Sequence, residues 1–174
     1  KLFALMEATP KIRATAIEVS SRRVAYLASE ADRLGHSPKI LEGDSTSTDW
    51  WDGTPFDAIL VDAPCSGSGT VRRHPEILIL QEIQRLRGYQ QQQLRLLANA
   101  WQTLKPGGLL LYCTCSVFET ENDDVIKAFL ADAREASVVN LALPTGNPTD
   151  VGWQLLPTDY KTDGFYYALL KRAE

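Results

Sequence analysis

The spacing of hydrophobic residues alternates along the chain between short continuous runs and a helical repeat. Short apolar runs, which are typical of β-strands, occur at residues 12–17, 39–41, 56–61 and 109–113. Between them, apolar residues recur every three or four positions, as they do on one face of a helix. Helices are therefore predicted over residues 1–8, 20–34, 83–101 and 121–131, and two further strands over residues 138–143 and 165–170.

The order of these elements predicts an α/β fold. Strands alternate with helices through most of the chain and two late strands close it, which is typical of a sheet with an antiparallel edge. The run from Phe56 to Val61 alternates poorly, as expected for a strand that is covered on both faces. A length of 174 residues is enough for one core and short for two, so residues 1–174 are interpreted as one domain.

An acid and two cysteines follow the ends of two predicted strands. Asp62 and Cys65 come after the strand at 56–61, and Cys115 comes after the strand at 109–113. Because ligands bind outside the carboxyl ends of parallel strands, these three residues are candidates for a functional site. A lone cysteine is more often a buried small hydrophobe, and we keep that interpretation for Cys113.

Two further acids, Glu18 and Asp44, stand at or just after the ends of the first two predicted strands. A carboxylate there can accept hydrogen bonds from the two hydroxyls of a ribose, as Glu18 would, or from an adenine amino group, as Asp44 would. The alternatives are structural. Glu18 would then only face solvent before a helix, where its charge suits the helix dipole, and Asp44 would only cap a turn with Ser45 and Thr46.

Composition and charge narrow the class of protein. A content of 44% hydrophobic and 23% charged residues fits a soluble globular protein, and no apolar run approaches the ~20 residues that cross a bilayer. The first residues are too soon interrupted for a signal peptide. Three irregularly spaced cysteines favour free thiols and a cytoplasmic setting. The net charge of −4 argues against nucleic-acid binding by this chain unaided, although Arg72, Arg73 and His74 form a basic cluster, or simply a solvated loop.

Two cysteine motifs occur in a specific order, Asp62-Ala63-Pro64-Cys65-Ser66-Gly67 and later Thr114-Cys115-Ser116-Val117. With them the chain resembles the RNA (cytosine-C5) methyltransferases that use S-adenosylmethionine, in particular the bacterial 16S ribosomal RNA enzymes of the Fmu/Sun (RsmB) type. The resemblance spans essentially the whole chain. Four further motifs carry it: Arg72-Arg73-His74-Pro75, Leu104-Lys105-Pro106-Gly107-Gly108, Glu121-Asn122 and Asp163-Gly164-Phe165.

This resemblance implies a Rossmann-like class I methyltransferase sheet, mostly parallel with an antiparallel closing strand, and an enzyme that acts on RNA through a covalent cysteine–cytosine adduct. The family's glycine-rich donor loop is absent and Lys1 falls where its lysine stands, so we expect a catalytic domain truncated at its N-terminus. The implied roles are Cys115 as nucleophile, Cys65 in resolving the adduct, Asp62 between cofactor and base, and Lys1, Glu18 and Asp44 in binding S-adenosylmethionine.

Other functions have weaker support. An amino-group methyltransferase would carry a second proline where Cys65 stands, and a nucleotide-binding dehydrogenase would need an intact glycine fingerprint. Metal binding is not expected, because His36 and His74 lie far apart without ligand spacing. A non-enzymatic alternative is a truncated or degenerate scaffold that binds RNA or a partner without turnover.

Overall fold

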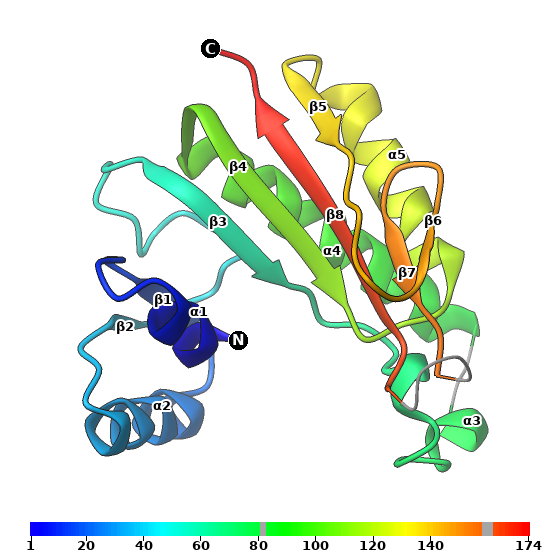
Figure 1. The fold of residues 1–174 in the computed structure, drawn as a ribbon, viewed down its shortest axis with the longest axis horizontal. Helices are drawn as coiled ribbons and strands as arrows, with labels where there is room; N and C mark the ends of the chain where they lie inside the picture. The colour runs from blue at the N-terminus through cyan, green and yellow to red at the C-terminus, as the bar shows by residue number, and fades with distance from the viewer. Residues whose placement is uncertain (81–82, 158–161) are drawn as a thin grey trace. The chain divides into compact units, whose positions relative to one another are not determined.

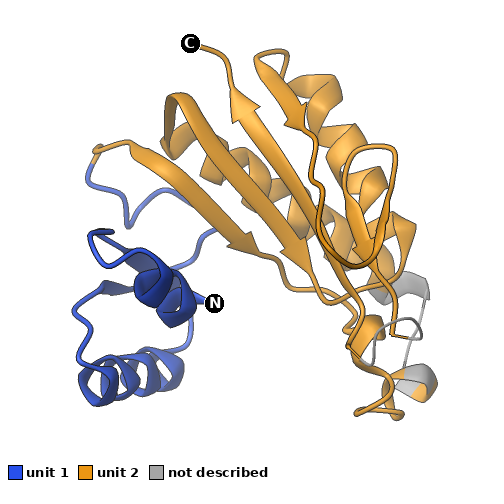
Figure 2. Ribbon diagram, viewed as in Figure 1, with its two compact units in different colours: residues 1–52 blue, residues 53–174 orange. Residues whose placement is uncertain are grey.

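The chain forms two compact units, residues 1–52 and residues 53–174 (Figure 2). The computed structural model describes residues 1–80, 83–157 and 162–174 (Figure 1). The interpretation of residues 1–174 as one catalytic domain stays a prediction.

The first unit is a β–α–β segment preceded by a short helix. Its strands β1 (Thr15–Glu18) and β2 (Lys39–Glu42) pair in parallel, with Glu18 opposite Glu42. Helix α2 (Ser21–Leu34) connects them, and α1 (Leu2–Ala8) precedes them. Gly35 ends α2 in the left-handed conformation, at φ 71°, and its N–H donates to the Ala31 and Asp32 carbonyls, as expected of a glycine at this position. Strand β1 is shorter than predicted, since it begins at Thr15 and not at Ile12.

The second unit is built on a mixed sheet with the strand order β3-β4-β8-β7-β6, in which β5 also pairs with β8. Only the β3–β4 pair is parallel among these strands, and the other four pairs are antiparallel. The strands are β3 (Phe56–Asp62), β4 (Leu104–Thr114), β5 (Ala136–Val139), β6 (Asn147–Pro148), β7 (Trp153–Leu155) and β8 (Phe165–Arg172). The α/β class and the antiparallel closing strand are confirmed, although this sheet is more antiparallel than predicted.

Helices α4 (Ile83–Thr103) and α5 (Asp123–Asp132) cover one face of this sheet (Figure 1). Their contact includes an edge-to-face pair between Trp101 and Phe129, with ring centroids 5.3 Å apart. Three short helices lie in the connections: η1 (Ser68–Thr70), α3 (Ile77–Leu80) and η2 (Glu119–Glu121). The core between helices and sheet consists chiefly of Val61, Leu97, Trp101, Leu110, Tyr112, Val125, Ile126, Phe129, Tyr166, Ala168 and Leu170.

Several strand predictions need correction. Strand β3 was expected to be covered on both faces, but only Val61 in it is buried, because α4 and α5 pack on one face of the sheet. The strand predicted over 138–143 instead runs from Ala136 to Val139. Strands β6 and β7 were not predicted, since strands of two or three residues show no readable alternation. Strand β4 already begins at Leu104 and contains an irregularity between the pairs Phe56–Leu104 and Ala58–Leu109.

Candidate functional site

The two cysteine motifs meet at the carboxyl edge of the parallel strands β3 and β4. Asp62 lies opposite Cys113 in the ladder, and the Ala63 N–H continues the pairing by donating to the Cys113 carbonyl at 2.9 Å. Just beyond this edge, the Sγ atoms of Cys65 and Cys115 are 3.5 Å apart, which is within hydrogen-bond distance for thiols. The structure therefore brings together the two cysteines that sequence analysis singled out.

The environment of Cys65 favours its protonated form. The pKa of the Cys65 thiol is raised well above its ordinary value, first by its hydrogen bond with Cys115 and then by burial. Two thiols that share one hydrogen bond do not both ionise readily, because a second negative charge would lie beside the first. Cys65 is therefore suited to remain an S–H donor toward the Cys115 sulfur at neutral pH.

Cys113 and Asp62 differ in exposure although they are opposite each other. Cys113 is fully buried, and its thiol donates to the Val61 carbonyl at 3.4 Å and lies 3.8 Å from Asp62 Oδ1. This confirms the interpretation of Cys113 as a buried small residue. Asp62 is exposed at the end of β3, on the same edge as Cys65 and Cys115.

A buried carboxylate, that of Glu121, is hydrogen-bonded to both cysteine motifs. It accepts hydrogen bonds from the Ser66 N–H at 2.7 Å, from the Ser66 hydroxyl at 2.6 Å and from the Ser116 hydroxyl. In the sequence Glu121 belongs to a family motif and begins a predicted helix, and no functional role was predicted for it. No pattern in the sequence indicates its role, because its donors come from two segments that meet only in the fold.

The loop after Cys65 is also held by the segment that precedes β8. The Gly69 N–H donates to the Cys115 carbonyl at 2.9 Å, and the Gly69 carbonyl accepts from the Gly164 N–H at 2.7 Å. A side chain at Gly69 would overlap the Gly164 carbonyl, so this approach requires glycine. The guanidinium of Arg73 pairs with Asp163 beside it. Two motifs that are far apart in sequence thus form one surface of the site.

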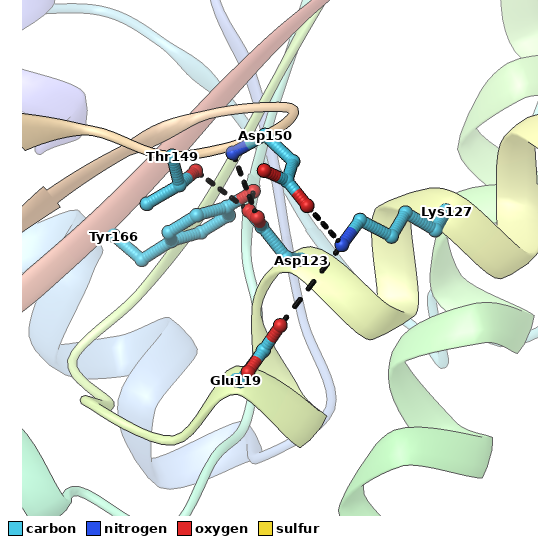
Figure 3. Close-up of polar contacts among 6 residues, drawn as sticks. All are labelled: Glu119, Asp123, Lys127, Thr149, Asp150 and Tyr166. Atoms are coloured by element: carbon cyan, nitrogen blue, oxygen red, sulfur yellow. Dashed lines mark hydrogen bonds and ion pairs between the residues drawn. The ribbon is translucent and has the colours of Figure 1, made fainter.

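A second buried carboxylate, Asp123, lies two residues after Glu121 and has different partners (Figure 3). It accepts from the Thr149 hydroxyl and the Tyr166 hydroxyl, both at 2.7 Å, and from the Asp150 N–H at 3.0 Å. Lys127, on the exposed side, pairs with Asp150 at 2.6 Å. Burial first, and then the hydrogen bond to Asp123, raise the pKa of Tyr166. This cluster fastens α5 to β8 and to the loop between β6 and β7.

The acids predicted to bind a nucleotide lie in the first unit. Glu18 is half-buried at the end of β1, where Oε1 accepts from the Ser20 N–H at 3.0 Å and Oε2 is 3.7 Å from Arg23. Asp44 is exposed, and its Oδ1 accepts from the Thr46 N–H at 2.8 Å and from the Thr46 hydroxyl at 2.7 Å. Lys1 is exposed at the start of α1. Both acids thus make the local contacts of their structural alternatives, and their binding roles stay predictions.

Over residues 1–80, 83–157 and 162–174, no three histidine, cysteine, aspartate or glutamate side chains gather as a metal site would require. No helix in those same ranges is long and apolar enough to cross a membrane.

Comparison with known proteins matches nearly the whole chain. Residues 1–171 match the sequence model of the family described as 16S rRNA methyltransferase RsmB/F. Ribosomal RNA small subunit methyltransferase B of Shewanella oneidensis is 40% identical over 170 residues, which are 97% of this chain and 40% of that protein. The protein of the same name from Xylella fastidiosa is 41% identical over 171 residues, 98% of this chain and 40% of its own length. The chain thus spans about 40% of the length of these relatives.

Solved structures have the same fold. A methyltransferase homolog protein from Pyrococcus horikoshii is 28% identical with a TM-score of 0.77, over 92% of this chain and 53% of that one. NSun6 from Pyrococcus horikoshii, solved with SFG, is 23% identical with a TM-score of 0.83, over 93% of this chain and 42% of that one. These likenesses confirm the prediction of a Rossmann-like methyltransferase fold.

Proposed function

This chain belongs to the 16S rRNA methyltransferase RsmB/F family, and on that premise we propose that it transfers a methyl group from S-adenosylmethionine to carbon 5 of a cytosine in RNA. The names of its relatives favour small-subunit ribosomal RNA as the substrate. The observation that carries the proposal is the 3.5 Å separation of the Cys65 and Cys115 sulfur atoms at the end of two parallel strands.

The proposed reaction needs a sulfur nucleophile because carbon 5 of cytosine is a weak nucleophile. The Cys115 thiolate adds to carbon 6, which forms an S–C6 bond and moves the C5–C6 π pair onto carbon 5. S-adenosylmethionine supplies an electrophilic methyl group to that carbon. Loss of the carbon-5 proton to a base then restores the C5–C6 double bond and expels the Cys115 thiolate.

Cys65 is proposed to assist the last of these steps. The raised pKa keeps its proton in place, so its S–H can donate to the Cys115 sulfur as that sulfur leaves carbon 6. A hydrogen bond to a developing thiolate stabilises the leaving group and therefore speeds release of the RNA.

Three acids have further proposed roles, Asp62 in the second unit and Glu18 and Asp44 in the first. Asp62 is exposed on the same edge as both cysteines, where its carboxylate can accept from the cytosine amino group or take up the carbon-5 proton. Glu18 and Asp44 supply acceptors for the ribose hydroxyls and the adenine of the cofactor.

The two cysteine roles are tested by serine substitutions in the full chain and in a chimera, in which the chain replaces the matching segment of the Shewanella oneidensis relative. Cys115→Ser should abolish both methyl transfer and any covalent RNA–protein species on a denaturing gel. Cys65→Ser should still form that species and should release it slowly. Accumulation in Cys115→Ser alone would reverse the roles, and normal methyl transfer in both variants would end the covalent mechanism.

Titration with S-adenosylhomocysteine separates the enzyme from a scaffold without turnover. An enzyme must bind this product of the cofactor, and a Glu18→Gln variant should bind it more weakly because one ribose acceptor is lost. If the chimera binds RNA but not S-adenosylhomocysteine, the scaffold alternative is correct.

A further inference from the structure

The two cysteine motifs are tied together at the residue that follows each cysteine. Ser66 follows β3 and Ser116 follows β4, yet both hydroxyls donate to the same carboxylate, that of Glu121. The Ser66 N–H adds a third bond to it at 2.7 Å. Glu121 and Ser116 are fully buried, so these bonds form away from water, where charge-assisted hydrogen bonds are strong.

Neighbouring groups fix the direction of these bonds. The Ser116 Oγ accepts from the Phe118 N–H at 3.1 Å and lies 3.0 Å from the Ser68 Oγ, which in turn accepts from the Val117 N–H at 3.0 Å. Since the Phe118 N–H occupies the acceptor side of the Ser116 hydroxyl, the proton of that hydroxyl is directed to Glu121. The carboxylate therefore faces three donors, and an acceptor-only group is what this position requires.

We propose that Glu121 is a positioning residue that holds the Cys65 and Cys115 motifs together, so that their two sulfur atoms lie at hydrogen-bond distance. This inference rests on the proposed function, because the short distance between the sulfur atoms matters only if the two thiols act on one adduct. Glu121 is placed to act through Ser66 and Ser116, each of which adjoins a cysteine in the chain.

The substitution that tests this role is Glu121→Gln. It retains the size of the side chain and replaces one acceptor oxygen by an NH₂ group, which would point at a donor. One or both serine contacts must then open, which moves the cysteines apart. Asp123→Asn is a matched control, because Asp123 is also a buried carboxylate with three donors and contacts neither cysteine motif.

The separation of the sulfur atoms can be read without RNA or cofactor by oxidising the full chain with diamide. Formation of the Cys65–Cys115 disulfide releases two protons and two electrons, which reduce diamide to the hydrazine, and mass spectrometry identifies the linked peptide. In Glu121→Gln we expect the rate of disulfide formation to fall about 10-fold, the factor that corresponds to one lost hydrogen bond in a buried site. In Asp123→Asn the rate should stay within about twofold of the wild-type rate.

Methyl transfer by the chimera gives the second readout. Because Glu121→Gln displaces Cys65 from Cys115, it should lower kcat with little change in the KM for RNA, and the covalent species should persist as in Cys65→Ser. A merely structural role would lower the amount of folded enzyme and leave the kcat of the folded fraction unchanged. Circular dichroism and thermal unfolding of each variant establish that fraction.

The outcomes distinguish the two proposals. If Glu121→Gln forms the disulfide at the wild-type rate, the positioning role is wrong, whatever the activity. If that variant does not fold, Ser66→Ala replaces it, since it removes one of the same bonds, and it should slow disulfide formation by about threefold. If the chimera never methylates RNA while Glu121→Gln slows disulfide formation, the positioning role stands and the proposed function fails.

Discussion

Glu121 and Asp123 are two buried carboxylates, two residues apart, that connect different parts of the molecule. Each accepts three hydrogen bonds, and each bridges segments that are distant in the chain. The donors to Glu121 come from the two segments that carry the cysteines. The donors to Asp123 come from β8 and from the loop between β6 and β7 (Figure 3).

These two residues show that burial of a charged side chain does not by itself identify its function. Both carboxylates must be satisfied because an unpaired buried charge is costly. The two residues differ in the segments that their donors belong to. The donors to Glu121 adjoin the two cysteines, whereas the donors to Asp123 connect helix α5 to a strand and a loop. We therefore expect loss of Glu121 to change thiol geometry and loss of Asp123 to change stability.

The largest effect should come from Gly69→Ala, which disrupts the loop after Cys65 and changes neither Glu121 nor Asp123. The new methyl group would overlap the backbone of Gly164, which cannot move without shifting β8. We expect a loss of about 3–5 kcal/mol in the free energy of unfolding, measured by urea titration. Gly88→Ala is the control, because nothing lies within 4 Å of the new methyl group and α4 should become slightly more stable. Equal stability of the two variants would contradict the close approach.

Asp123→Ala should have the next largest effect. It leaves the buried Tyr166 hydroxyl, the Thr149 hydroxyl and the Asp150 N–H without their acceptor, so the free energy of unfolding should fall by about 2–4 kcal/mol. Adding Tyr166→Phe should restore part of this loss, because it removes the fully buried Tyr166 hydroxyl that Asp123→Ala leaves without an acceptor. Strictly additive losses in the double variant would show that the two side chains do not interact.

Alkaline pH should lower the free energy of unfolding through two groups, Cys65 and Tyr166, and the loss should begin at a different pH for each. The pKa of Cys65 is raised from an ordinary value of 9.0, and that of Tyr166 is raised from 10.0. The folded state thus favours the protonated form of each group. The stability that each group contributes is fully present below its ordinary pKa and is lost as the pH rises above that value. Each group should remove up to about 1.4 kcal/mol per pH unit in that range.

Urea titrations between about pH 8 and pH 11 measure this loss. Cys65→Ala should delay its onset from near pH 9 to near pH 10, and Tyr166→Phe should reduce its slope above pH 10. A pH profile that neither substitution changes would exclude these two groups as its source.

The smallest effect should come from Lys127→Gln. Lys127 pairs with Asp150 and lies 3.9 Å from Glu119, but all three side chains are largely exposed (Figure 3). Exposed ion pairs contribute little because water and salt screen them. We expect the urea midpoint to remain within experimental error of wild type, at low and at high salt. A clear, salt-dependent loss would mean that the ion pair stabilises the Asp123 cluster.

The fold was predictable wherever hydrophobic patterning was long enough to read. The runs that became β1, β2, β3 and β8, and the repeats that became α2, α4 and α5, were identified within a few residues, whereas β4 begins at Leu104 and not at Leu109. The segment between β5 and β8 was not, because β6 and β7 are held by tertiary contacts. One such contact joins the Trp153 indole N–H to the Thr145 carbonyl at 2.7 Å.

The site was predictable to the extent that strand ends determine it. Asp62, Cys65 and Cys115 follow apolar runs, and parallel pairing of those runs brings them to one edge. Glu121 could not be assigned from the sequence, because acids are usually exposed and its burial depends on serines in two other segments. The same holds for Asp123, whose donors lie more than twenty residues further along the chain.

The contact between Gly69 and Gly164 also has a consequence for biosynthesis. Gly69 bonds to Cys115 on one side and to Gly164 on the other, and Gly164 immediately precedes β8. While a ribosome is still making the chain, both cysteines emerge long before the strand that completes their surroundings. At about 5–20 residues per second, synthesis of the segment from Cys115 to Gly164 takes several seconds. The bond between Gly69 and Gly164 can form only after the segment before β8 has been made, so it is a late contact of the site.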